Sequence, residues 1–382
     1  MAIRAAVVGT GFIGPVHVEA LQRIGVEVVG LCSSHPDRAQ AKARRLGVPK
    51  VYSTYEELLA DPLVEVVHIA TPNALHYPQA RAALLAGKHV VCEKPLAMNT
   101  RESAELVELA ERSGLVHAVC YNIRFYPMVQ QARALIRDGA LGDLRLIHGS
   151  YLQDWLLLET DWNWRLIPEL AGETRAVGDI GSHWIDLMVF LSGRRVERVF
   201  ADMATFLPVR KRPRKPVETF ETKGLQAEDY VEEPIRTEDY ATILLHFEGG
   251  VRGVLTVSQI SPGRKNRLWF EIDGARGAVA WDSEEPNALW VGHRDQPNQW
   301  WIKDPALMDA SARPWADYPG GHTEGYPDTF KMLFRAVYAR IADPTTPVAY
   351  PTFADGHEMM RVLEAIVASA REGRWIEIPR GS

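Results

Sequence analysis

The stretch IRAAVVGTGFIG, residues 3–14, passes from an apolar run into a glycine motif and decides the fold of the first part of the chain. In such a motif Gly9 makes a tight turn, Gly11 lets the backbone approach a pyrophosphate, and Gly14 lets the next helix pack closely. Phosphates would then face N–H groups at a helix N-terminus. The motif therefore predicts a bound dinucleotide held by residues 9–14, including Phe12 and Ile13. A purely structural glycine turn is the alternative.

Length and composition set the class of protein. A chain of 382 residues predicts two domains. The net charge of −6 argues against nucleic acid and membrane partners. The N-terminus opens directly into a strand, without a signal segment. The three cysteines, Cys32, Cys92 and Cys120, lack CxxC spacing and each closes a predicted strand, so we expect reduced core residues in a cytoplasmic enzyme without a metal site.

The first part alternates short apolar runs with helical segments. Strands are predicted at 3–8, 26–32, 64–70, 89–92 and 116–120, and helices at 15–24, 36–46, 55–60, 77–86 and 100–113. Four of these helices are followed by a glycine that can end them, namely Gly25, Gly47, Gly87 and Gly114. The alternation predicts an α/β fold over residues 1–122, a doubly wound parallel Rossmann sheet with its ligand crevice at the carboxyl ends of the strands.

After residue 122 strands follow one another in series. Helices are predicted at 127–138, 182–191, 325–342 and 353–372, and strands at 144–153, 196–205, 240–247, 251–259, 268–273, 278–282 and 289–292. Residues 123–382 therefore form a predicted α+β domain with a large, open, mostly antiparallel sheet for substrate binding and dimerisation. Alternatively, the C-terminal helices pack back on the first domain. Residues 210–237, rich in charge and proline, are predicted to be a long loop or lid.

The end of the second strand bears on the choice of cofactor. Ser33 stands where an NAD site usually has an acid for the ribose hydroxyl. Ser33, Ser34 and Arg38 would accept a 2′-phosphate, which favours NADP over NAD. The alternative is that the two serines cap a helix and that NAD binds without the acid.

Two later strands also end in polar residues. Thr71, Pro72 and Asn73 follow one strand, so we expect them near the bridging phosphates, with His76 as a weaker candidate. Glu93 and Lys94 follow the next strand and are directed toward the same crevice. The Lys94 ammonium could bind a substrate oxygen and stabilise alkoxide character as hydride leaves the carbon.

The second domain offers an acid–base pair. Asp179 and His183 lie four residues apart, and they would face one site if Gly181 opens a helix. Histidine is a natural acceptor for an alcohol proton near neutral pH, and a carboxylate beside it can fix its tautomer. A structural histidine on an amphipathic helix is the alternative.

Aromatic and hydrogen-bonding residues gather in further candidate substrate contacts, because tryptophan faces stack on sugars. These are Asp154, Trp155, Trp162, Trp164, Arg165 and, more weakly, His322 and Tyr326. Core packing is an equally good interpretation of the tryptophans.

These motifs occur in an order that resembles the glucose–fructose oxidoreductase, inositol dehydrogenase and MocA family over nearly the whole chain. The motifs that carry the resemblance are Gly9–Gly14, Thr71-Pro72-Asn73 with His76, Glu93-Lys94-Pro95, Asn122 with Arg124 and Pro127, Trp164-Arg165, and Asp179 with His183. The resemblance implies a Rossmann domain followed by an open-sheet domain, paired in homodimers or homotetramers through that sheet.

The resemblance also implies hydride transfer between NAD(P) and a secondary alcohol or ketone of a sugar, glycoside or cyclitol. It implies that Lys94, Asp179 and His183 are the catalytic residues. Asn122, Trp164 and Arg165 would then touch the cofactor and Arg124 the substrate. A glycosidase or lyase that retains its cofactor is the second possibility, and a non-catalytic dinucleotide sensor is the third.

Overall fold

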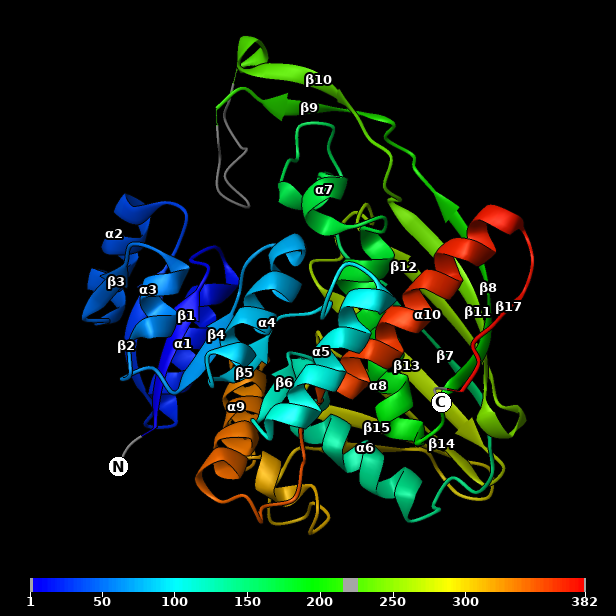
Figure 1. Ribbon diagram of the computed structural model, residues 1–382. Coiled ribbons are helices and arrows are strands. Elements are labelled where there is room, and N and C mark those ends of the chain that lie inside the picture. Colours follow the sequence, from blue (N-terminus) through cyan, green and yellow to red (C-terminus); the bar gives the residue numbers. More distant parts are fainter. Residues whose placement is uncertain (1–2, 216–225, 381–382) are drawn as a thin grey trace. The chain divides into compact units, whose positions relative to one another are not determined.

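The computed structural model describes residues 3–215 and 226–380, and these divide into two compact units (Figure 1). Unit one comprises residues 1–122, 169–172 and 327–360. Unit two comprises residues 123–168, 173–326 and 361–382. The first unit therefore includes residues 327–360 from the C-terminal region. The sequence-based division had assigned these residues to the second domain, with packing on the first domain as the alternative.

Unit one is built on a parallel sheet with the strand order β3-β2-β1-β4-β5-β6. Its strands are β1 (Arg4–Val8), β2 (Glu27–Cys32), β3 (Lys50–Tyr52), β4 (Val66–Ile69), β5 (His89–Cys92) and β6 (His117–Val119). Its helices are α1 (Ile13–Arg23), α2 (Pro36–Leu46), α3 (Tyr55–Ala60), α4 (His76–Leu85), α5 (Thr100–Ser113) and most of α9 (Tyr326–Ala342). The predicted doubly wound sheet is confirmed.

Local sequence explains these elements. The strands of the sheet are almost entirely buried, which fits their continuous apolar runs. Gly47 and Gly114 end α2 and α5 with positive φ values of 69° and 66°, a conformation that glycine adopts without strain. The short edge strand β3 was not predicted, because three residues with one buried side chain give no readable pattern.

Unit two contains a larger, mixed sheet. Among the described residues its strand order is β16-β15-β14-β13-β7-β12-β11-β8-β17, and all neighbours are antiparallel except β12 and β7. The strands are β7 (Leu144–Leu152), β8 (Val196–Ala204), β11 (Tyr240–Phe247), β12 (Arg252–Ser258), β13 (Arg267–Gly274), β14 (Gly277–Asp282), β15 (Ala288–His293), β16 (Gln299–Ile302) and β17 (Ile376–Glu377). The predicted mostly antiparallel sheet is confirmed.

Helices cover one face of this sheet. α6 (Pro127–Arg137) and α8 (Ser182–Ser192) pack on each other and on the strands, and Ser369 of α10 (Phe353–Glu372) accepts a hydrogen bond from Ala201 N on β8. α7 (Pro168–Ala171) is a single turn. The burial of alternate residues along β11 and β13 agrees with one covered and one open face.

One expectation about unit two was wrong. Residues 210–237 do not form a plain loop: β9 (Val209–Pro213) and β10 (Tyr230–Pro234) pair antiparallel as a separate ribbon, while 216–225 lie outside the described residues. Cross-strand ion pairs such as Arg212–Glu233 at 3.0 Å let a charged, core-poor segment form strands. Gly181 is the N-cap residue of α8, and a π-helical segment (Val177–Gly181) directly precedes this helix.

Candidate functional site

The glycine loop between β1 and α1 has the shape that a dinucleotide pyrophosphate requires. A Cβ on Gly9 (φ +94°) would lie 2.4 Å from Ala70 O, and one on Gly14 would lie 2.0 Å from Gly9 O, so these two glycines serve the packing of the chain itself. A Cβ on Gly11 would meet nothing within 4 Å. Gly11 is therefore explained by the approach of an outside group, and the N-terminal amides of α1 fit an anion.

Polar groups line the end of β2 beside this loop. Thr10 Oγ1 donates to Ser33 Oγ at 3.0 Å, and Lys42 Nζ donates to Thr10 O at 2.7 Å. Ser34 Oγ lies 3.0 Å from His35 Nδ1, and Arg38 is exposed on α2. Lys42, which sequence reasoning missed, lies one helical turn after Arg38 and so shares its face of α2.

The loop after β4 is held by its own hydrogen bonds. Thr71 Oγ1 donates to Gln79 Oε1 at 2.7 Å, and Asn73 Nδ2 donates to Ala171 O at 2.7 Å. Pro72 precedes the 3-10 turn Asn73–Leu75. His76 is fully buried, with ring nitrogens 2.6 Å from Pro95 O and 2.8 Å from Thr71 O, and burial lowers its pKa. These contacts join the loop after β4 to the loop after β5.

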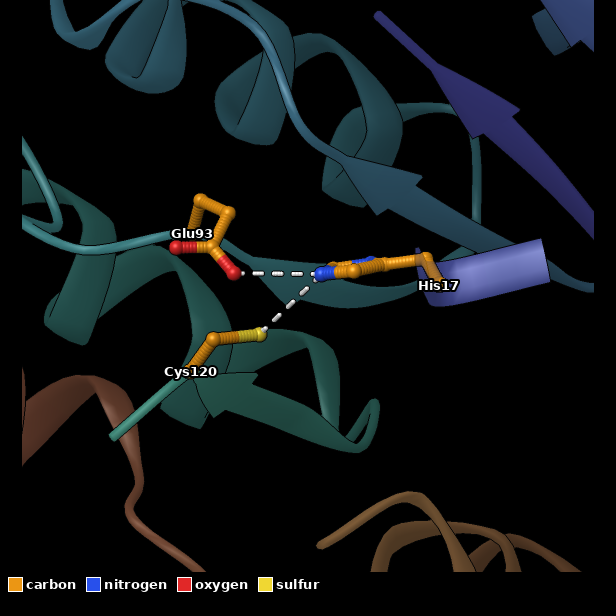
Figure 2. Close-up of side chains that lie close together, drawn as sticks. All are labelled: His17, Glu93 and Cys120. Atoms are coloured by element: carbon orange, nitrogen blue, oxygen red, sulfur yellow. Dashed lines mark hydrogen bonds and ion pairs between the residues drawn. The ribbon is translucent and has the colours of Figure 1, made fainter. Parts of the chain in front are cut away.

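Glu93 and Lys94 follow β5 directly. Glu93 is buried, and its Oε1 lies 3.1 Å from Nε2 of His17 on α1 (Figure 2). Cys120 Sγ, after β6, lies 3.9 Å from the same His17 nitrogen. Lys94 is half-buried. Figure 2 shows the three side chains of His17, Glu93 and Cys120 pointing toward one another, and ligand atoms this close could also hold a metal ion.

Two further buried residues extend this cluster. His17 Nδ1 lies 3.1 Å from His68 Nδ1, and His68 Nε2 lies 3.0 Å from the Tyr338 hydroxyl. Sequence reasoning missed His17, His68 and Tyr338. The signal that could have found His68 is its place as the polar residue in the apolar run of β4. Asn122, predicted to touch the cofactor, is buried in unit one and donates to Thr329 Oγ1 at 2.7 Å.

In unit two, Asp179 is held from two sides. Arg165 Nε lies 2.9 Å from Asp179 Oδ1, and Gln259 Nε2 donates to Asp179 Oδ2 at 2.9 Å. Trp164 packs its ring 4.7 Å from the Arg165 guanidinium. The structure thus brings Arg165 and Asp179 together, whereas the sequence had paired Asp179 only with His183. Asp179 lies in the π-helical segment (Val177–Gly181), and such segments are frequent at functional sites.

His183 lies in the first turn of α8 and is 9% exposed. Its ring is 6.4 Å from the ring of Tyr151 on β7, whose hydroxyl donates to Asn266 Oδ1. Burial raises the pKa of Tyr151, so this phenol stays protonated. A neutral phenol, fixed by its hydrogen bond, therefore lies beside the imidazole of His183.

A buried ionic network supports this segment. Arg175 and Arg210 are both fully buried against Asp239, with Arg210 Nη2 at 2.8 Å from Asp239 Oδ1. The Glu238 carboxylate accepts hydrogen bonds from Arg175 N and Val177 N and so caps the helical segment that carries Asp179. Burial alone would raise the pKa of Asp239, but the two guanidinium ions bring it below its usual value.

Several predicted substrate contacts have other roles. Arg124 is buried in a bidentate ion pair with Asp186, with N–O distances of 2.8 and 2.5 Å. Trp162 packs in an apolar cluster with Leu156, Leu166 and Ile235, which agrees with the core interpretation. Asp154 Oδ2 accepts a hydrogen bond from Lys265 Nζ at 2.5 Å.

The remaining three candidates are Trp155, which is half-buried, Tyr326, which begins α9 and is half-buried, and His322, which is exposed with Nδ1 3.3 Å from Gly320 O. Each unit therefore contributes one set of functional groups to the candidate chemistry. Unit one has a phosphate-binding loop and a lysine at the same edge of one parallel sheet. Unit two has a histidine and a braced carboxylate at the start of one helix.

No helix within residues 3–215 and 226–380 is long and apolar enough to cross a membrane.

Comparisons with known proteins agree with this arrangement. Residues 3–121 match the model of an oxidoreductase family with an NAD-binding Rossmann fold, and residues 129–280 match the GFO/IDH/MocA C-terminal domain. Levoglucosan dehydrogenase of Pseudarthrobacter phenanthrenivorans is 30% identical over 99% of this chain and 98% of its own length.

Solved structures give the same result. The complex of levoglucosan dehydrogenase with NADH and L-sorbose superposes with a TM-score of 0.88 at 29% identity over 100% of both chains. An inositol dehydrogenase homolog from Azotobacter vinelandii, complexed with NAD+, gives 0.86 at 28% identity over 99% of this chain and 97% of its own. The predicted family and oxidoreductase class are confirmed: the chain belongs to the GFO/IDH/MocA family of oxidoreductases, with the NAD-binding Rossmann fold of that family in unit one.

Proposed function

We propose that this enzyme transfers hydride between a nicotinamide dinucleotide and a secondary alcohol or ketone of a sugar, anhydrosugar or cyclitol. One observation carries the proposal. Lys94 follows β5 and the glycine loop follows β1, and both strands belong to one parallel sheet, so a cation and a pyrophosphate site lie at the same edge. The named substrates of the similar proteins, levoglucosan and inositol, are polyhydroxylated rings.

The roles of the residues follow from their chemistry. The nicotinamide supplies the hydride acceptor or donor when it is bound. The glycine loop and the N-terminal amides of α1 would hold the pyrophosphate. Lys94 donates a hydrogen bond to the reacting oxygen and stabilises its alkoxide character.

His183 accepts the hydroxyl proton in the oxidative direction. Asp179, braced by Arg165 and Gln259, supplies negative charge near the resulting imidazolium. Arg165 and Gln259 each contact one carboxylate oxygen of Asp179. Asp179 therefore contributes a fixed electrostatic field and does not transfer a proton.

We propose a preference for NADP. Ser33 in place of an acid removes the repulsion of a 2′-phosphate, and Arg38 and Lys42 place two cations on one face of α2 beside it. The proposal rests on these residues of this chain, because the two solved relatives named above are complexes with NADH and NAD+.

We also propose a cytoplasmic homodimer or homotetramer that pairs through the open face of the sheet in unit two. Side chains of one row across that face include Leu244, Val254, Trp290 and Trp300, and Leu244 and Trp300 are 41% and 64% exposed. In the same row, His148, Glu271 and Ala280 stand between Val254 and Trp290, so the exposed apolar side chains lie at its two ends. Exposed apolar patches are typical of protein interfaces. Sedimentation equilibrium that finds only a monomer would contradict this assembly.

A substrate panel tests the proposed function. Anhydrosugars, monosaccharides, glycosides and inositols are each incubated with NAD and with NADP, and the absorbance of the reduced nicotinamide is followed. We expect reduced cofactor to accumulate with at least one polyol, and NADP to give the higher kcat/KM. Product formation without accumulation of reduced cofactor would instead indicate a lyase or glycosidase. Tight cofactor binding without turnover of any member would indicate a sensor.

A further inference from the structure

A chain of four buried side chains in unit one ends at the residue beside Lys94. In order, Tyr338 Oη lies 3.0 Å from His68 Nε2, His68 Nδ1 lies 3.1 Å from His17 Nδ1, and His17 Nε2 lies 3.1 Å from Glu93 Oε1. His17 and His68 are fully buried, and Tyr338 and Glu93 are nearly so. The proposed reaction uses none of these four groups.

The chemistry of the groups gives this chain one direction. An ionised carboxylate only accepts hydrogen bonds, so His17 Nε2 must donate to Glu93. A neutral imidazole that donates from Nε2 accepts at Nδ1, so His68 must donate from Nδ1. His68 then accepts at Nε2, and the Tyr338 hydroxyl donates there. Every hydrogen bond in the series is satisfied with both rings neutral.

The surroundings support a neutral His68 ring. Burial lowers the pKa of His68 far below its usual value and raises the pKa of Tyr338. Phe330 and Phe334 of α9 pack on His17 with ring centroids at 5.5 and 4.9 Å. The titratable and charged neighbours that bear on the chain are Cys120 after β6, whose thiol pKa is raised by burial, Glu65 before β4, and Lys94 itself.

The other oxygen of Glu93 faces Lys94. Glu93 Oε2 accepts the backbone N–H of Lys94 at 3.2 Å, and Glu93 N donates to Ile69 O at 2.9 Å. The Glu93 backbone is thus hydrogen-bonded to β4, and its side chain contacts His17 of α1. The carboxylate therefore joins the helix that follows the glycine loop to the backbone of the lysine.

We propose that His17 and His68 are positioning residues for Lys94: the buried chain fixes the Glu93 carboxylate, and the carboxylate fixes the backbone from which Lys94 projects. This inference rests on the proposed role of Lys94 in the reaction. Helix α1 thereby supports both the pyrophosphate loop and the lysine, so one rigid element sets the distance between them.

Glu93→Gln tests the direction of the chain. The Gln oxygen can replace Oε2 at the Lys94 N–H, and its NH₂ then faces His17, which must accept at Nε2. Both rings are therefore expected to change tautomer, His17 from Nε2–H to Nδ1–H and His68 from Nδ1–H to Nε2–H. Long-range ¹H–¹⁵N NMR of histidine-labelled protein reports each tautomer. His68 in the same tautomer in both proteins would overturn the assigned direction.

Variants of His17 test positioning. Glutamine places an N–H near the position of Nε2 and keeps the donor to Glu93, whereas leucine removes it. We expect His17→Leu to lower kcat by about tenfold to a hundredfold through misplacement of Lys94, with KM for the cofactor within about twofold of wild type, and His17→Gln to retain most turnover. His89→Asn, at the far end of β5, is the control with unchanged kcat.

A wild-type kcat in folded His17→Leu would overturn the positioning role. If that variant does not fold, His17→Asn gives the same test, because its short amide reaches His68 but not Glu93. Stoichiometric metal in the purified enzyme would also overturn the inference, since His17 Nε2 would then be a ligand. An active Lys94→Met enzyme would refute the proposed function. If Lys94→Met is inactive and His17→Leu is fully active, only this inference is refuted.

Discussion

The two units solve the problem of buried polar groups in different ways. In unit one, His17, His68 and Tyr338 form a series of neutral groups that ends at one carboxylate, Glu93. In unit two, Arg175 and Arg210 are fully buried as ions around Asp239. A neutral series is directional and costs little desolvation, whereas an ionic cluster is strong but depends on every member. The difference predicts unequal responses to the loss of a single group.

The largest effect on stability is expected from Asp239→Ala, because the substitution leaves two buried guanidinium ions without their counter-charge. We expect the free energy of unfolding to fall by about 3–5 kcal/mol, measured by urea denaturation. Glu159→Ala removes the exposed partner of Lys211 and serves as the control, with a change within about 0.5 kcal/mol. An Asp239→Ala protein as stable as the control variant would show that the ionic cluster does not hold unit two together.

We expect unit one to lose stability at low pH, because its half-buried histidine His117 is neutral in the folded chain. Burial lowers the pKa of His117 from 6.5 to about 4, and its Nδ1 accepts the Phe353 N–H that begins α10. Between these two pH values the unfolded chain binds more protons than the folded chain, so stability falls as the pH falls. The partly exposed ring contributes about 2–3 kcal/mol to this loss between pH 6.5 and 4.

Denaturation curves at both pH values measure the acid effect. His117→Gln, which keeps a side-chain acceptor without a titrating ring, should lose stability less steeply over the same range. Equal slopes for the two proteins would contradict the assignment of this effect to His117.

A smaller effect is expected from Tyr338→Phe, which removes the hydroxyl at the far end of the neutral series. His68 Nε2 then lacks its donor, so the free energy of unfolding should fall by about 1 kcal/mol. Thermal unfolding measures the change, with Tyr318→Phe, on an exposed ring, as the control. A loss as large as that of Asp239→Ala would mean that unit one is not built on a neutral series.

Much of this architecture could be predicted from the sequence because it depends on local patterns. The apolar run of β5 and the glycine after α5 determine a strand and a helix end without reference to distant residues. The ribbon of β9 and β10 could not be predicted, because its stability comes from cross-strand pairs such as Arg212–Glu233, 21 residues apart.

The candidate site divides in the same way. Gly11 and Lys94 are readable from motifs that follow strands. The Arg165–Asp179 ion pair and the His68–Tyr338 contact, which spans 270 residues, depend on the folded chain. Arg124 and Trp162 show why residue type alone is ambiguous, because residue types suited to binding a sugar are equally suited to a buried ion pair and an apolar cluster.

The most direct test of the account compares turnover and cofactor binding in Lys94→Met and in Lys50→Met, a control on the exposed Lys50 of β3. With a polyol that the wild-type enzyme oxidises, we expect Lys94→Met to lose a factor of about 10²–10³ in kcat while it binds the dinucleotide with an unchanged Kd, and Lys50→Met to match wild type. Wild-type kcat in Lys94→Met would contradict the account.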